Sequence, residues 1–136
     1  MGSAMAPAAL APIKAHFQDL NTGPEDFDRI VTGDLGQAGT EMLMELARLD
    51  GISLGGKLMD CGTTVFENHT QDVHAGGSGC GCSAITLCGY LLEQLKSGKL
   101  KKILFCGTGA LLSPTSTQQG LPIPGVCHAV CITGGR

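Results

Sequence analysis

The chain has 136 residues, of which 43% are apolar and 15% charged, and its formal net charge is −3. No run of basic residues exceeds Lys101-Lys102, so the sequence lacks the electrostatic footprint of a protein that binds nucleic acid or an anionic membrane surface. It contains no apolar stretch of about 18 residues that would span a bilayer and no charged side chain before Lys14 that would mark a secretion signal.

The hydrophobic periodicity predicts elements in the order α-β-α-β-α-β-β. Helices are expected over residues 5–20, from the glycine turn at 33–36 to residue 49, and from the glycine-rich segment after residue 77 to residue 96. Strands are expected over residues 28–32, 57–61, 101–106 and 126–133.

Prolines and glycines mark several boundaries of these elements. Pro7 fits the first turn of the first helix, whereas Pro12 predicts either a later start or a kink. Gly107-Thr108-Gly109 is expected to end the third strand in a turn, and an irregular loop rich in Pro, Gly, Ser and Thr then leads into the last strand.

Strands that alternate with helices of this length predict a layered α/β fold, with a mixed β-sheet flanked by helices. The last two strands are expected to lie antiparallel at one edge of that sheet. No internal repeat is visible, so residues 1–136 are expected to form a single domain.

The chain holds 21 glycines and seven cysteines. The glycines follow no period and so indicate turns and close backbone approaches rather than a fibrous chain. An odd number of cysteines leaves at least one thiol unpaired, and the apolar neighbours of Cys88, Cys106, Cys127 and Cys131 predict that most thiols are buried. This pattern favours a reducing, cytoplasmic compartment.

The segment 72–83 is the first candidate site. It places His74 a few residues before a glycine-dense helix start that contains Gly77, Ser78 and Gly79. The backbone N–H groups and the dipole at such a start favour a carboxylate or a phosphate, and His74 would add a donor. The alternative, given equal weight, is that the glycines only permit tight packing and that His74 is held structurally.

Asp34, in the glycine turn 33–36, is the second candidate. This turn lacks the first Gly-x-Gly of a dinucleotide fingerprint, which excludes a Rossmann site. An N-cap is the favoured interpretation of Asp34, and a ligand contact is the alternative. If the strands are parallel, this turn, the loop of His74 and the turn at Gly107 and Thr108 converge at the carboxyl edge of the sheet.

Other cysteine and histidine chemistry is disfavoured. A zinc site at His74, Cys80 and Cys82 lacks a second pair of ligands at finger spacing. A nucleophilic Cys80 with His74 as its base lacks a third group that would orient the histidine. His128 is interpreted as a strand residue rather than as a ligand.

Three segments share a pattern with a known family. They are IVTGDLG at 30–36, QDVHAGGSGCGCS at 71–83 and GALLSPTS at 109–116. Together they resemble the stage V sporulation protein AD family, whose members are about twice as long as this chain. The resemblance runs nearly end to end and implies that the chain is the carboxy-terminal half of such a protein.

That family is similar to thiolases and ketoacyl synthases, in which two α/β halves meet at a shared active site. The resemblance therefore implies one half of a thiolase-like fold, with His74 at the position of the thiolase histidine and Asp34 near the thiolase asparagine or the ketoacyl synthase histidine. The acid/base cysteine of thiolases falls at Phe105 or Cys106. Because the nucleophilic cysteine belongs to the other half, and an aspartate stands where an oxyanion needs a donor, the chain is not expected to be an enzyme.

The resemblance also implies a ligand and partners in sporulation and germination. The ligand is dipicolinic acid, a pyridine with two carboxylates that is often handled with calcium. It would enter the forespore through the SpoVA membrane channel proteins, beside which this protein would lie on the cytoplasmic side of the inner membrane. The carboxylates would meet His74, Ser78, Thr108 and backbone amides, or they would be bridged by calcium held at Asp34 or Asp72. The alternatives are an acyltransferase half and a structural assembly subunit, and a homo-oligomer is expected because a thiolase unit buries one face against its twin.

Overall fold

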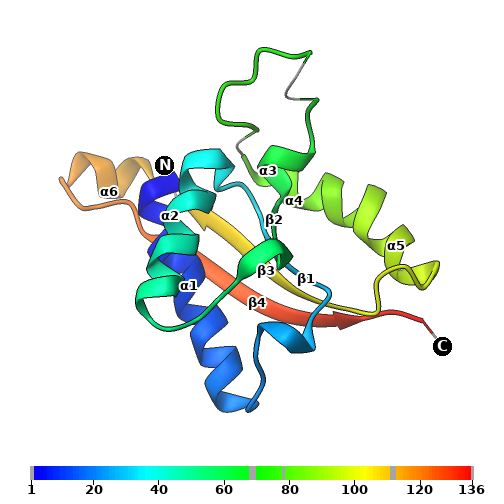
Figure 1. Ribbon diagram of the computed structural model, residues 1–136. Helices are drawn as coiled ribbons and strands as arrows, with labels where there is room; N and C mark the ends of the chain where they lie inside the picture. Colours follow the sequence, from blue (N-terminus) through cyan, green and yellow to red (C-terminus); the bar gives the residue numbers. More distant parts are fainter. Residues whose placement is uncertain (1, 68–69, 78, 111–112, 136) are drawn as a thin grey trace.

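A four-stranded sheet with helices on both faces forms the centre of the molecule in the computed structural model, which describes residues 2–67, 70–77, 79–110 and 113–135 (Figure 1). The strand order is β2-β1-β3-β4, where β1 pairs in parallel with both β2 and β3, and β3 pairs antiparallel with β4. The strands are β1 (Arg29–Thr32), β2 (Leu58–Asp60), β3 (Lys102–Ala110) and β4 (Gly125–Thr133). The predicted mixed α/β sheet, with an antiparallel last strand at one edge, is confirmed.

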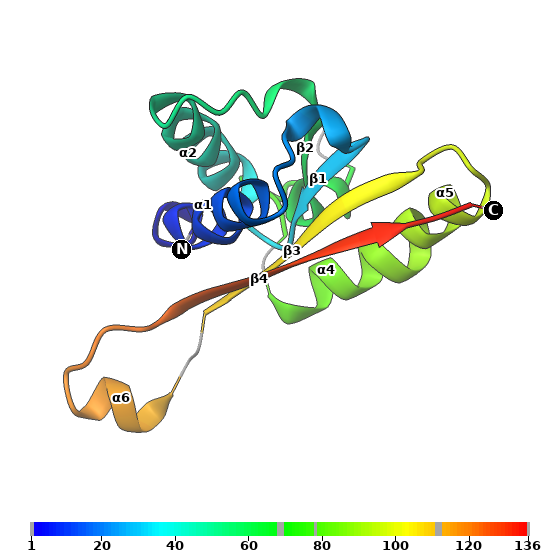
Figure 2. The same ribbon diagram turned by 90° about the horizontal axis from the view of Figure 1, so that it is seen from below.

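Two helices, α1 (Gly2–Asp19) and α2 (Gly36–Leu49), cover one face of the sheet, as Figure 2 shows. The buried residues of α2 recur at helical spacing, so one stripe of the helix faces the core. Pro7 and Pro12 both lie inside α1, and the expectation that Pro7 occupies the first turn is wrong. The apolar face of α1 packs on the sheet on both sides of the prolines, and this burial offsets the hydrogen bonds that the prolines cannot donate.

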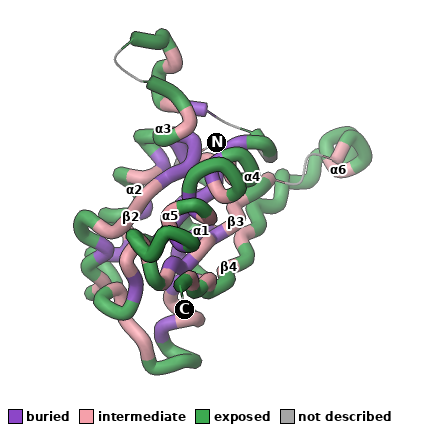
Figure 3. The backbone as a smooth tube through the Cα atoms, turned by 90° about the vertical axis from the view of Figure 1, so that its right-hand side faces the viewer, coloured by how far each residue is buried: buried purple, intermediate pink, exposed green. Residues whose placement is uncertain are grey.

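The other face is covered by one continuous helical stretch made of α4 (Cys80–Thr86), the π-helical turn η3 (Leu87–Leu91) and α5 (Leu92–Lys96). Its buried side chains Leu91 and Leu95 pack with Val31 of β1 and Ile103 of β3. The predicted third helix is thus present. In Figure 3 the buried residues gather where the helices meet the sheet, while α6 (Pro114–Gln118) lies apart from them.

The strand β3 continues through Gly107, Thr108 and Gly109, so the prediction of a turn at these residues is wrong. In the antiparallel register Gly107 lies opposite His128, and Gly109 lies opposite Val126. Backbone hydrogen bonds to β4 hold this segment extended, which outweighs the weak strand preference of glycine. The loop that follows contains α6, whose first turn is capped by the Ser113 hydroxyl, which accepts a hydrogen bond from the N–H of Ser116 at 3.4 Å.

Short elements complete the described part of the chain. They are η1 (Pro24–Asp26), η2 (Gly55–Lys57) and α3 (Cys61–Thr64). No helix within the described ranges combines the length and the apolar character that a membrane crossing requires.

The environments of the cysteines differ more than the sequence predicts. Cys61 and Cys106 are fully buried, but Cys88 and Cys131 are exposed, so the expectation of burial is wrong for this second pair. Residues on the outer face of a helix or of an edge strand have apolar sequence neighbours without being covered themselves. Burial raises the pKa of the Cys61 thiol to about 12. A hydrogen bond with Cys127, together with burial, raises the pKa of Cys106.

These differences predict selective thiol labelling. At pH 8 we expect iodoacetamide to modify Cys88 and Cys131 readily and to leave Cys61 and Cys106 unmodified, because the thiolate is the reactive form and the buried thiols stay protonated. Peptide mass spectrometry after a short labelling pulse measures the four positions separately. Denatured chain serves as the control, in which all four should react; equal labelling of Cys61 and Cys88 in the folded chain would contradict the prediction.

Candidate functional site

Asp34, Thr108 and Gly79 meet at the carboxyl edge of the parallel strands. The Thr108 hydroxyl donates a hydrogen bond to Asp34 Oδ1 at 3.0 Å and accepts hydrogen bonds from the backbone N–H groups of Gly33 and Asp34 at 3.1 and 3.2 Å. The N–H of Gly79, just before α4, donates to Asp34 Oδ2 at 3.0 Å. The three glycine segments that the sequence singled out therefore share one rim of the sheet.

Asp34 is not the N-cap of α2, and the favoured interpretation of this residue is wrong. The helix begins at Gly36, and the carboxylate of Asp34 is directed to Thr108 and Gly79 instead. Asp34 thus holds the end of β3 and the segment before α4 together.

Asp60, which the sequence analysis did not single out, caps α2 from the end of β2. Its Oδ1 accepts hydrogen bonds from the Thr32 hydroxyl at 2.7 Å and the Leu35 N–H at 2.9 Å. Its Oδ2 accepts hydrogen bonds from the N–H groups of Gly36 at 3.0 Å and Thr63 at 3.2 Å. The carboxylate is buried and so fills the anion site at the start of α2 with a group of the protein. A local signal was available, because Asp60 also precedes the short helix α3 as its N-cap.

His74 and Gly77, two further predicted site residues in the loop before α4, lie in different surroundings. His74 has a positive φ of 50° and a side chain that is 89% exposed, and its Nδ1 lies 3.6 Å from Asp72 Oδ1. Its side chain is therefore turned to solvent. Gly77 is buried, and its N–H donates to the Gly62 carbonyl at 2.7 Å, which is the packing role given above as the alternative. Ser78 lies outside the described residues.

An open groove of about 370 Å³ runs along β3 and β4 next to this rim. It is lined by Gly107, Thr108, Gly109, Ala110, Val126 and His128. Two of the predicted site residues, Gly107 and Thr108, thus belong both to the strand pair and to a surface that a ligand can reach.

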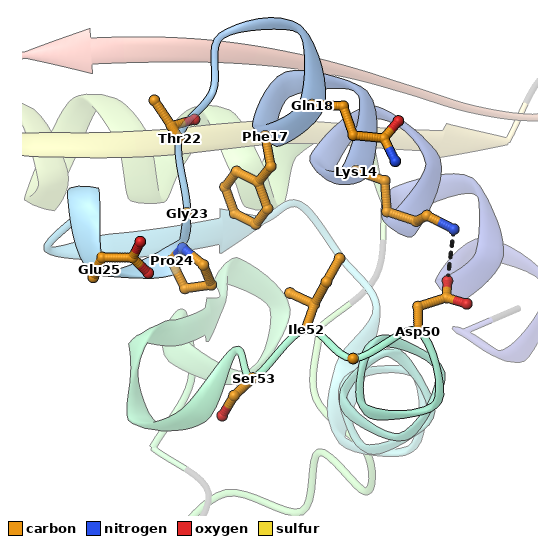
Figure 4. Close-up of a pocket in the computed structure, with 11 residues that line it drawn as sticks. Lys14, Phe17, Gln18, Thr22, Gly23, Pro24, Glu25, Asp50, Ile52 and Ser53 are labelled. Atoms are coloured by element: carbon orange, nitrogen blue, oxygen red, sulfur yellow. Dashed lines mark hydrogen bonds and ion pairs between the residues drawn. The ribbon is translucent and has the colours of Figure 1, made fainter.

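A second and larger cavity, of about 560 Å³, lies between the end of α1, the segment that leads to β1 and the segment after α2. Nothing in the sequence predicted this cavity. Figure 4 shows Phe17, Pro24 and Ile52 around it, with the Lys14 Nζ paired to Asp50 Oδ2 at 2.8 Å. Because Asp50 already neutralises Lys14, this cavity offers no free cation to a carboxylate ligand. The groove at β3 and β4 contains Gly107 and Thr108 of the predicted site and is therefore the better candidate for the ligand surface.

Calcium at Asp34 or Asp72 is the expectation for the same rim. Within the described ranges, no three His, Cys, Asp or Glu side chains lie together in an arrangement that would hold a metal ion. Asp34 is engaged with Thr108 and Gly79, and Asp72 lies on the exposed loop.

A mixed sheet with helices on both faces, and with polar groups gathered at the carboxyl edge of its parallel strands, defines an α/β protein, a class in which bound ligands commonly lie at that edge. The family model of stage V sporulation protein AD matches residues 1–133. The stage V sporulation protein AD of Bacillus subtilis (strain 168) is 47% identical over 130 residues, which cover 96% of this chain and 38% of that protein. The chain belongs to the stage V sporulation protein AD family, and it is a sporulation protein. It spans less than half the length of this relative.

Proposed function

We propose that this chain is part of a non-enzymatic protein that binds dipicolinic acid, or its calcium chelate, for uptake into the developing spore. Membership in the family supports the role in sporulation. The observation that carries ligand binding is the rim of Asp34, Thr108 and Gly79 beside an open groove. A small ligand there would meet backbone groups and a few polar side chains, as in most ligand sites.

The chemistry at the end of β3 favours binding over catalysis. Of the two positions that correspond to the thiolase acid/base cysteine, Phe105 has no ionisable group, and Cys106 is fully buried. The raised pKa of Cys106 keeps it a thiol near neutral pH, and it packs toward α1 with the core, away from the groove. Asp34 is a hydrogen-bond acceptor where an oxyanion would need a donor.

The wider assembly follows from the same proposal. The protein would act beside the SpoVA membrane channel proteins, on the cytoplasmic side of the forespore inner membrane, without crossing the bilayer itself. A homo-oligomer or the rest of a longer chain would cover the apolar side chains that α4 and β4 leave exposed, among them Ile85 and Val130.

Calorimetric titration of the 136-residue chain with dipicolinate, with and without calcium, tests the proposal. We expect saturable binding. His74 lies outside the lining of the groove, so His74→Ala should lower the affinity about tenfold, as for one charge-assisted hydrogen bond, only where the loop of His74 reaches the bound ligand. Lys99→Ala, which removes an exposed positive charge before β3, is the matched control and should bind like the parent chain. No saturable heat in either condition would contradict the proposal, and unchanged affinity of His74→Ala would remove only His74 from the site.

A further inference from the structure

The groove on β3 and β4 has a floor of bare backbone. A Cβ atom added at Gly109 would meet no atom within 4 Å, and one added at Gly107 would meet only the His128 carbonyl oxygen, at 3.9 Å. The residues across the strand pair are His128, opposite Gly107, and Val126, opposite Gly109. Because Gly107 and Gly109 have no side chains, whereas His128 and Val126 have large ones, the strand pair carries a slot about one side chain deep.

This slot opens on the face of the sheet that α4 and α5 occupy. A Cβ at Gly125 would point to Met5 of α1, and side chains alternate along a strand, so Val126 and His128 point to the opposite face. On that face α5 packs over the other end of β3, around Ile103. Figure 2 shows β3 and β4 extending past the helices toward α6. His128 is exposed and Val126 is 40% exposed, so the slot is accessible in this chain.

The lining of the slot suits a flat, partly apolar ligand that carries a hydrogen-bond acceptor for His128. Peptide planes form the floor and Val126 forms an apolar wall, both of which suit the face of an aromatic ring. His128 is the ionisable side chain among the described residues of the lining, which include no carboxylate. The nearby Asp34 carboxylate accepts hydrogen bonds from Thr108 and Gly79, which stabilise its negative charge.

We propose that this slot binds a planar aromatic carboxylate, with the ring over Gly107 and Gly109 and a carboxylate oxygen hydrogen-bonded to the His128 imidazole. The proposal rests on the proposed function and assigns the ligand a place in it. In this proposal His128 contacts the ligand directly, whereas the sequence alone indicated only that it belongs to a strand.

Filling the slot tests the proposal sharply. Gly109→Val places a β-branched residue, which strands favour, into space that no protein atom occupies, so the chain should fold at least as stably as before. We expect calorimetry to show at least a hundredfold loss of affinity for dipicolinate and for isophthalate, a benzene ring with the same two carboxylates. His128→Ala should lose about tenfold and His128→Gln, which keeps a donor, clearly less.

The matched control is Gly56→Val, a glycine that also has no atom within 4 Å of an added Cβ but lies far along the chain in η2. It should leave binding unchanged. If the parent chain binds dipicolinate and Gly109→Val binds it equally well, the slot is not the site, while the proposed function stands. If the parent chain binds neither probe, the proposed function fails, and the slot proposal fails with it.

Discussion

Replacement of Asp60 by asparagine is expected to lower the free energy of unfolding by about 3 kcal/mol. Each carboxylate oxygen of Asp60 accepts two hydrogen bonds, and at least one of the two comes from a buried backbone N–H. Whichever way the asparagine amide turns, its NH₂ group faces the N–H of Leu35 or of Gly36, so at least one buried donor loses its acceptor at a cost of about 1–3 kcal/mol, and the remaining bonds lose the assistance of the charge. The residue is 2% exposed, so water cannot replace the missing oxygen.

Urea denaturation followed by circular dichroism measures this change. Asp72→Asn is the matched control, because Asp72 has a side chain that is 90% exposed, and it should shift stability by less than about 0.5 kcal/mol. A similarly small effect for Asp60→Asn would show that the four hydrogen bonds are not essential to the fold. Because Asp60 also holds the turn that carries Asp34, we expect the variant to weaken dipicolinate binding as well.

Replacement of Gly62 by alanine is expected to destabilise the protein by about 1–3 kcal/mol and to displace the loop before α4. The added methyl group would overlap the carbonyl oxygen of Gly77 and lie 3.0 Å from Asp60 Oδ2. The obstacle is backbone, which does not give way as a flexible side chain would, so the cost is that of an overpacked core. The hydrogen bond from the Gly77 N–H to the Gly62 carbonyl is expected to break.

A glycine of the helix that follows the loop supplies a control with the opposite expected effect on stability. In Gly81→Ala the new methyl group would lie 3.9 Å from Ile85 Cδ1, and Gly81 lies within α4, so the gain in helix propensity should stabilise the chain by up to about 1 kcal/mol. Thermal unfolding gives both stabilities, and amide chemical shifts of residues 71–77 report the position of the loop. A Gly62→Ala variant as stable as the parent, with unchanged shifts, would contradict the expected overlap.

Asp60 and Gly62 show how the rim depends on β2. The carboxylate of Asp60 positions the turn at 35–36, and Gly62 provides the space into which the segment around Gly77 packs. Asp34 and Gly79 then meet at a distance that a hydrogen bond spans. The geometry of the candidate site is therefore set from a neighbouring strand rather than from the motifs themselves.

The sequence by itself determined the class of fold, the order of its main elements and the family. Helical and strand periods are local properties, so α2, β1 and β4 begin and end within a few residues of their expected positions. The convergence of Asp34, the loop before α4 and Thr108 was also predictable, because parallel strands bring their carboxyl ends to one edge.

Only the tertiary structure decided the outcomes that depend on contacts between distant segments. Pairing with β4 keeps Gly107 and Gly109 in a strand, although alone they would favour a turn. Packing leaves Cys131 exposed and buries Cys106. It also makes Asp60, rather than Asp34, the residue whose carboxylate accepts hydrogen bonds at the start of α2. Such choices depend on which buried polar groups find partners and which faces are covered, and both are decided by residues far apart in the chain.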